Sequence, residues 1–187
     1  MNLMELDCHM TKDGEVVVAH DGDLERMCGE QHRGKKLAEY NFSELPPMRR
    51  KIKMHLSPGD YELKDHEDGK FSLLKDLFIQ SPTSTLFSID MKDASNDICI
   101  TVNELVKEHK VETRVIWGSM FPAQHELVTK MNNNVSHFYS GPQAMKTYLL
   151  WIFGCLFCCP LKGDMLMTTH VTKRQQVRLK SMLADRG

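Results

Sequence analysis

The sequence predicts an α/β fold in which strand and helix units surround a parallel sheet. Short runs rich in β-branched residues alternate with stretches whose apolar residues recur at helical spacing. The 187 residues are enough for one domain with a hydrophobic core. They are fewer than the roughly 200–250 residues of a complete (β/α)₈ barrel. The net charge of −1 provides no overall positive field, so nucleic acid is not expected as a partner.

Each expected strand, turn or helix is indicated by its local sequence. The expected strands are residues 3–8, 15–20, 86–92, 114–118 and 135–139. A tight turn at 11–14 separates the first two strands, with Gly14 where a positive φ is needed. Asn96 or Asp97 is expected to cap a helix that runs to Lys107, because the apolar residues of this stretch follow helical spacing.

Residues 46–70 differ in character from the segments around them. They contain prolines, a basic cluster at 49–53 and an acidic stretch with histidines. The basic cluster is interpreted as a solvated loop, in preference to a phosphate-binding patch. We therefore expect a single partial domain over residues 1–187, with an insertion loop at about 46–70.

Residues 148–161 form the only long apolar run. As a helix they would extend about 21 Å, which is short of the ~30 Å hydrocarbon core of a bilayer. Two interpretations remain open: a buried barrel helix, or a segment that contacts a membrane surface through its aromatic residues.

The sequence at the two ends of the chain leads to further expectations. A strand begins at once after Met1, and residues 178–187 have the pattern of an amphipathic helix that stops at Gly187. Both ends therefore resemble cuts through a larger fold. The six cysteines lack the spacing of a disulfide framework and the N-terminus lacks a signal-peptide pattern, which together predict a reducing compartment.

Acidic and basic side chains are paired on two of the expected strands. Glu5 and Asp7 are two residues apart, as are Asp90 and Lys92, so each pair shares one face of its strand. Adjacent carboxylates repel unless a cation lies between them, and divalent ions that prefer oxygen ligands serve this purpose. His20 closes the second strand, and we expect it at the same sheet edge, where it is suited to proton transfer.

These residues belong to motifs that follow one another along the chain. The motifs are ELDCHMTKDGEVVVAHDGDLER at 5–26, ELPP at 44–47, FSLLKDLF at 71–78 and SIDMK at 88–92. In this order they resemble the glycerophosphodiester phosphodiesterase family, most closely its membrane-associated members of the lysophospholipase D type. The resemblance is strong over residues 1–120 and weak after 162.

The resemblance implies a TIM (β/α)₈ barrel, here incomplete because the first strand and the last two strands are lacking. It implies that Glu5, Asp7 and Asp90 bind a divalent metal, Mg²⁺ or Ca²⁺. His20 would be a catalytic acid or base, and Lys92 would help hold the phosphate. The family usually has glutamate at position 90, so the shorter Asp90 would shift the ion.

One family motif is out of place. The family begins with a His-Arg-Gly strand that provides a second catalytic histidine, and this strand would precede residue 1. The tripeptide at 32–34 has the same letters, but it follows the strand of His20 instead of preceding the strand of Glu5. It lies in a polar stretch, and we interpret it as a coincidence.

The expected function is therefore a metal-dependent phosphodiesterase for glycerophosphodiesters or lysophospholipids in lipid metabolism. The alternative is a catalytically inactive truncated isoform or remnant that keeps lipid or membrane-surface binding. By resemblance, the protein is expected at the cytoplasmic side of the endoplasmic reticulum or perinuclear membrane. A membrane surface is an expected partner, and no protein partner can be inferred.

Overall fold

The computed structural model describes residues 2–54, 59–65, 67–158 and 163–164. Its main sheet has the strand order β5-β2-β1-β6-β7-β8. The strands are β1 Asn2–Met10, β2 Val16–Val18, β5 Ser72–Leu73, β6 Thr85–Met91, β7 Val115–Ser119 and β8 Ser136–His137. All five predicted strands are present with shifted ends. The helix predicted at 178–187 lies outside the described residues.

Strand direction divides the sheet into two parts. β1, β6, β7 and β8 are parallel neighbours, as predicted. β2 instead pairs antiparallel with β1, with Cys8 opposite Val18, so the two strands form a hairpin. Gly14 in the connecting turn has φ +83°, as its position in the sequence predicts. The prediction that β2 ends at the same edge as β1 is therefore wrong, because a short turn can join only antiparallel strands.

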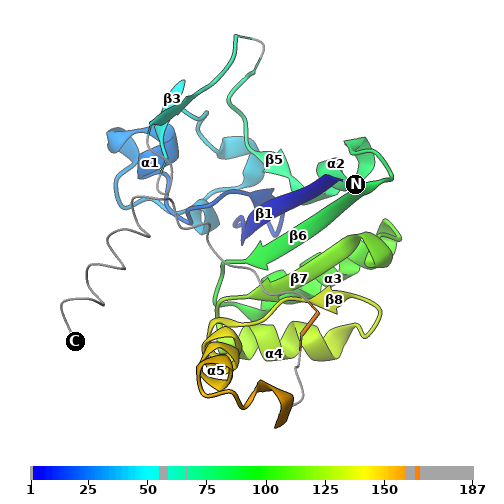
Figure 1. Cartoon of the computed structure of the whole chain (residues 1–187). Coiled ribbons are helices and arrows are strands. Elements are labelled where there is room, and N and C mark those ends of the chain that lie inside the picture. Colours follow the sequence, from blue (N-terminus) through cyan, green and yellow to red (C-terminus); the bar gives the residue numbers. More distant parts are fainter. Residues whose placement is uncertain (1, 55–58, 66, 159–162, 165–187) are drawn as a thin grey trace, which may run out of the picture.

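Helices cover one face of the parallel strands. They are α2 Leu74–Gln80, α3 Asn96–Glu108 and α4 Pro122–Met131, and α3 and α4 lie behind β7 in Figure 1. The cap of α3 is Ser95 and not Asn96 or Asp97, since the Ser95 hydroxyl accepts a hydrogen bond from the Asp97 N–H at 3.0 Å. The apolar side chains of this strand face, among them Phe87, form the main core with these helices.

The opposite face of the same strands is polar. Glu5 and Asp7 on β1 and Asp90 on β6 alternate with the core residues, as the period of two requires. Within the described residues the sheet is an open arc that ends at β5 and β8, and it does not close into a barrel. The polar face would be the inside of a closed barrel.

A smaller layer lies beyond the hairpin. It contains α1 Glu25–Cys28, η1 Glu30–His32, η2 Leu37–Glu39 and η3 Phe42–Glu44, and its apolar residues form a second core with Val17 and Ala19. Within residues 46–70, β3 Lys51–Lys53 and β4 Asp60–Glu62 pair antiparallel and project from this layer (Figure 1). The extent of the insertion and the single-domain assignment stay predictions.

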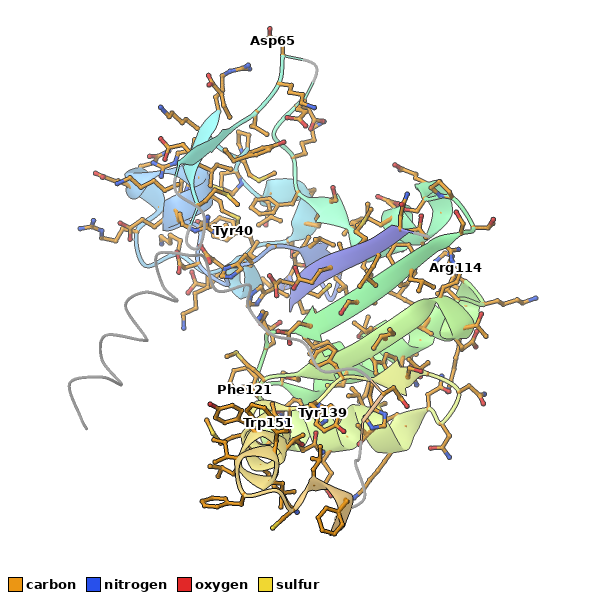
Figure 2. All side chains as sticks on the ribbon, viewed as in Figure 1. Tyr40, Asp65, Arg114, Phe121, Tyr139 and Trp151 are labelled. Atoms are coloured by element: carbon orange, nitrogen blue, oxygen red, sulfur yellow. The ribbon has the colours of Figure 1, made fainter. Side chains whose placement is uncertain are left out.

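The last described helix, α5 Gly141–Ile152, differs from the others. A capping box between Ser140 and Gln143 begins it, η5 Leu156–Cys158 follows it, and none of its residues is buried. Figure 2 shows its side chains, with Trp151 labelled, standing out around the ribbon at the lower edge of the molecule. Trp151 is 64% exposed and Phe157 is 87% exposed.

Of the two interpretations left open for residues 148–161, the exposure of the described part, residues 148–158, does not support the buried barrel helix. Among the described elements α5 contacts η5, and this contact leaves its apolar side chains unburied. No helix in the described ranges is both long and apolar enough to cross a membrane. The remaining η4, Glu112–Arg114, leads into β7.

Candidate functional site

The pairing of β1 with β6 assembles the candidate site. In its parallel register Asp7 lies opposite Asp90 and Glu5 lies opposite Ser88. Residues two apart share a face, so Lys92 follows Asp90 on the same side. Side chains that are more than eighty residues apart in the sequence therefore meet on the polar face of the sheet.

Lys92 lies between two of the carboxylates. Its Nζ is 3.0 Å from Asp7 Oδ1 and 2.5 Å from Asp90 Oδ2, and the side chain is only 20% exposed. Burial disfavours the charged form, but the hydrogen bonds to Asp90 and Asp7 outweigh it and raise the pKa of Lys92 above its ordinary value. Lys92 is therefore a firmly protonated cation that offsets the charge of both aspartates.

Glu5 lies two residues before Asp7 on β1 and interacts electrostatically with the same charged side chains. Partial burial and repulsion from Asp7 raise its pKa, and Asp90 adds to the repulsion. The positive charges of Lys92 and His20 act in the opposite direction. The predicted convergence of Glu5, Asp7, His20, Asp90 and Lys92 is therefore present as one set of interacting charges.

His20 reaches this set through the hairpin, not through the end of a parallel strand. The Ala19 N–H donates to the Asp7 carbonyl oxygen at 2.9 Å, which places His20 beside the middle of β1. The His20 Nδ1 lies 2.6 Å from Asp21 Oδ1, and Arg26 Nε donates to the other Asp21 oxygen. Although burial acts against it, these hydrogen bonds from Arg26 and His20 lower the pKa of Asp21. An ionised Asp21 thus holds a histidine whose side chain is 51% exposed.

The carboxylates suit a hard divalent cation in their chemistry. Oxygen ligands of this kind are those that Mg²⁺ and Ca²⁺ prefer. Asp90 Oδ1 is buried without a hydrogen-bond partner, which is costly unless a ligand meets it. Among the described residues, however, no group of three or more acidic, histidine or cysteine side chains is already arranged to hold a metal.

Lys92 accounts for this arrangement. It was predicted to hold phosphate, but here it pairs with the proposed metal ligands Asp7 and Asp90. A divalent ion that bound both aspartates would take the position of the Lys92 ammonium group. The roles predicted for these residues stay predictions.

The tripeptide at 32–34 lies away from the cluster. His32 ends η1, and Arg33 pairs with Glu25 at 2.8 Å on the exposed side of the loop after β2. No contact found within the described part of the chain joins Arg33 to the carboxylates on β1 and β6. This agrees with its interpretation as a coincidence of sequence.

Two residues of this region were missed by the sequence reasoning. His9 is 8% exposed and its Nδ1 lies 2.6 Å from Asp93 Oδ1. The other Asp93 oxygen accepts the Met10 N–H at 2.7 Å, while His9 Nε2 is buried without a partner. The sequence could have indicated His9, because it continues the two-residue spacing of Glu5 and Asp7 along one strand face. Nothing in the local sequence indicated that Asp93 would be its partner.

Comparison with known proteins gives the family. The model of the glycerophosphoryl diester phosphodiesterase family matches residues 1–141. Lysophospholipase D GDPD1 of Mus musculus is 32% identical over 165 residues, which is 86% of this chain and 49% of that protein. Lysophospholipase D GDPD3 of Homo sapiens is 29% identical over 118 residues, 63% of this chain and 35% of that protein. The chain thus spans half or less of the length of these relatives.

Solved structures show the same fold. The glycerophosphodiester phosphodiesterase of Thermotoga maritima superposes with a TM-score of 0.56 at 19% identity, covering 94% of this chain and 76% of that one. A glycerophosphoryl diester phosphodiesterase domain from Mycobacterium tuberculosis gives 0.62 at 11% identity, covering 83% and 55%. The predicted incomplete TIM barrel is confirmed in its described part, and the chain belongs to the glycerophosphoryl diester phosphodiesterase family.

Proposed function

We propose that this chain carries the metal-binding half of a phosphodiesterase site for glycerophosphodiesters or lysophospholipids. The observation that carries the proposal is the Asp7–Lys92–Asp90 cluster, with Glu5 and His20 within its electrostatic reach. Family membership and the names of the lysophospholipase D relatives support this substrate class.

Glu5, Asp7 and Asp90 are the proposed ligands of Mg²⁺ or Ca²⁺. A bound divalent ion would neutralise a phosphate oxygen and offset the negative charge that grows in the transition state. Lys92 would then leave the two aspartates and donate hydrogen bonds to another phosphate oxygen.

His20 is the proposed proton donor for the leaving alcohol. Asp21 accepts a hydrogen bond from Nδ1 and so orients the ring, and Nε2 of the protonated imidazole would donate to the oxygen of the breaking P–O bond. Water would attack phosphorus and release one proton to solvent as its oxygen becomes bonded to phosphorus. The P–O bond to the alcohol would break, the alcohol would leave with the proton from His20, and His20 would regain a proton from solvent. Such a transfer contributes roughly 10²–10⁴ in rate.

A second candidate function rests on a different region. The exposed apolar residues of α5 and the segment after it favour binding at a lipid surface, with or without turnover. This would make the chain a surface-binding protein that retains family residues. Its location at the cytoplasmic side of an intracellular membrane stays a prediction.

One assay distinguishes the two functions. Release of choline from glycerophosphocholine and from lysophosphatidylcholine is measured with millimolar Mg²⁺, with Ca²⁺ and with chelator. We expect metal-dependent release that falls at least 10²-fold in Asp7→Asn and in His20→Ala. Glu15→Gln is the matched control, because Glu15 pairs with Lys75 far from the proposed ligands.

The phosphodiesterase proposal fails if the wild-type protein releases no choline under any condition. It also fails if release is unaffected by chelator and by both substitutions. Binding to vesicles without release would then favour the surface-binding function.

A further inference from the structure

A hollow of about 370 Å³ lies next to the turn that carries His20, and all of the described residues that line it are charged. The hollow shares Asp21 with the candidate site. One Asp21 oxygen faces His20 Nδ1 at 2.6 Å, and the other accepts a hydrogen bond from Arg26 Nε. Arg26 Nη1 in turn donates to the Lys53 carbonyl oxygen at 2.8 Å. The hollow is therefore bounded by the turn of His20 on one side and by residues 49–53 on the other.

Some of the charged side chains around the hollow already have partners. Asp21 pairs with Arg26, and Glu25 pairs with Arg33 at 2.8 Å. Within the described part of the chain no ion pair is found for the other lining residues, which are Asp23, Glu30, Arg49 and Lys53. The hollow therefore offers both negative and positive groups to a ligand.

Arg49 is the least solvated of these groups. Its backbone N–H donates to the Met27 carbonyl oxygen at 2.8 Å, which fixes its position beside α1. The residue is partly buried, and its Nε is buried without a hydrogen-bond partner among the described residues. A guanidinium withdrawn from water without a partner is costly, and its planar set of donors matches a carboxylate. The interpretation of residues 49–53 as a solvated loop therefore does not hold for Arg49.

The position of the hollow suits the leaving group of the proposed reaction. His20 is the proposed proton donor to the oxygen of the leaving alcohol, and the head group of the substrate is attached at this oxygen. The head group therefore extends from beside His20. Asp21, which contacts His20, also lines the hollow.

We propose that this hollow binds the head group of the substrate and prefers one with a carboxylate beside its ammonium group, as in serine. The inference rests on the proposed function and adds a determinant of head-group specificity. The carboxylate accepts hydrogen bonds from Arg49, and the ammonium group lies against the acidic side chains of Asp23 and Glu30. Choline and ethanolamine carry only the cation, so they leave the Arg49 guanidinium unpaired. A site with a polar group of this kind discriminates against the compound that lacks its partner.

The test compares two ligands that differ only by this carboxylate. Binding of phosphoserine and of phosphoethanolamine, the head-group halves of the corresponding phosphodiesters, is measured by calorimetry with Mg²⁺ present. Neither compound is a phosphodiester, so cleavage does not disturb the measurement. We expect wild-type protein to bind phosphoserine at least about tenfold more tightly. Equal affinities, or no binding of either compound, would overturn the inference without any variant.

Variants at neighbouring positions then assign the preference to one side chain. Arg49→Met removes the guanidinium and should make the two affinities equal. Arg49→Lys keeps the charge but cannot form two parallel hydrogen bonds to a carboxylate, so it should lower the preference without abolishing it. Arg50→Met is the matched control, because Arg50 pairs with Asp65 outside the hollow, and it should keep the wild-type ratio. A folded Arg49→Met protein that retains the preference would show that Arg49 does not bind the carboxylate.

A release assay separates this inference from the proposed function. With Mg²⁺ or Ca²⁺ present, we expect kcat/KM for glycerophosphoserine to exceed that for glycerophosphoethanolamine at least about tenfold, and this ratio should fall in Arg49→Met. If neither compound is cleaved although phosphoserine binds in preference, the proposed function fails and the binding site stands. If both compounds are cleaved with equal efficiency, the proposed function stands and the inference is wrong.

Discussion

The polar face of β1 and β6 and the apolar helix α5 show opposite exceptions to the usual distribution of residues. On the strands, Asp7, Asp90 and Lys92 are largely withdrawn from water, and Lys92 bonds to both aspartates. On α5 and after it, Trp151 and Phe157 are exposed. Both arrangements cost free energy in the isolated chain. The comparison teaches that the two regions depart from the usual distribution in opposite directions: charged side chains are withdrawn from water on the strands, and apolar side chains are exposed on and after α5.

The largest effect is expected at the lysine between the carboxylates. Lys92→Met leaves Asp7 and Asp90 facing each other without a cation, so metal-free protein should lose about 2–3 kcal/mol of stability. The same change should strengthen Mg²⁺ or Ca²⁺ binding at least about tenfold, because the ion no longer displaces an ammonium group. Chemical denaturation and calorimetric titration measure the two effects.

Lys75→Met is the matched control, because Lys75 forms a more exposed pair with Glu15. It should cost at most about 1 kcal/mol and leave metal affinity unchanged. Weaker metal binding in Lys92→Met would show that Lys92 assists the ion instead of competing with it.

The second prediction compares Gly22, which lies against the His9 ring, with Gly141 at the start of α5. Gly22→Ala places a methyl group 3.0 Å from the His9 ring, and we expect a loss of about 1–3 kcal/mol as the turn of His20 is pushed away. Gly141→Ala at the start of α5 meets open space and should change stability by less than about 0.5 kcal/mol. Urea denaturation gives both values. Equal losses would mean that the His9 contact is not tightly packed.

The apolar region is tested with vesicles. Co-sedimentation with vesicles of phosphatidylcholine and phosphatidylserine is measured for wild-type protein and for Leu149→Glu with Phe153→Glu. Both positions are exposed, so folding should be retained, while binding should fall at least tenfold. Unchanged sedimentation of the folded double variant would remove the lipid surface as the partner of α5.

The smallest effect concerns Glu5. Its pKa is raised in the folded protein by burial and by Asp7, so its ionised form opposes folding at neutral pH. Because Glu5 is exposed to solvent, water screens this repulsion. Glu5→Gln should therefore raise the unfolding temperature of metal-free protein by no more than about 1 °C at pH 7. The gain should vanish as the pH falls through the raised pKa, because Glu5 is then protonated in the folded state. Thermal scans between pH 4 and pH 7 in chelator measure it, and a gain that persists at pH 4 would contradict this cause.

Several features of the fold and site were predictable because they are local. The strands at residues 3–8 and 86–92, the turn at Gly14 and the helix after Asn96 follow from residue type and spacing. The shared faces of Glu5 with Asp7 and of Asp90 with Lys92 follow from the period of two in a strand. The family followed from motifs that occur in one order along the chain.

Other features depended on contacts between distant segments. The direction of β2, and so the route of His20 to the site, depends on hairpin pairing with β1. The capping residue of α3 moved by one position, because Ser95 and not Asn96 has the extended backbone that an N-cap requires. The exposure of α5 depends on what packs over it, and helical periodicity does not contain that information.

By itself, then, the sequence determined which side chains share a strand face and which family motifs are present, because backbone periodicity is a local property. Only the tertiary structure decided that Asp7 lies opposite Asp90, that Lys92 sits between them, and that Asp93 holds His9. These contacts depend on the register between β1 and β6. That register is set by the packing of the apolar face of the sheet against the helices, through residues far away in the sequence.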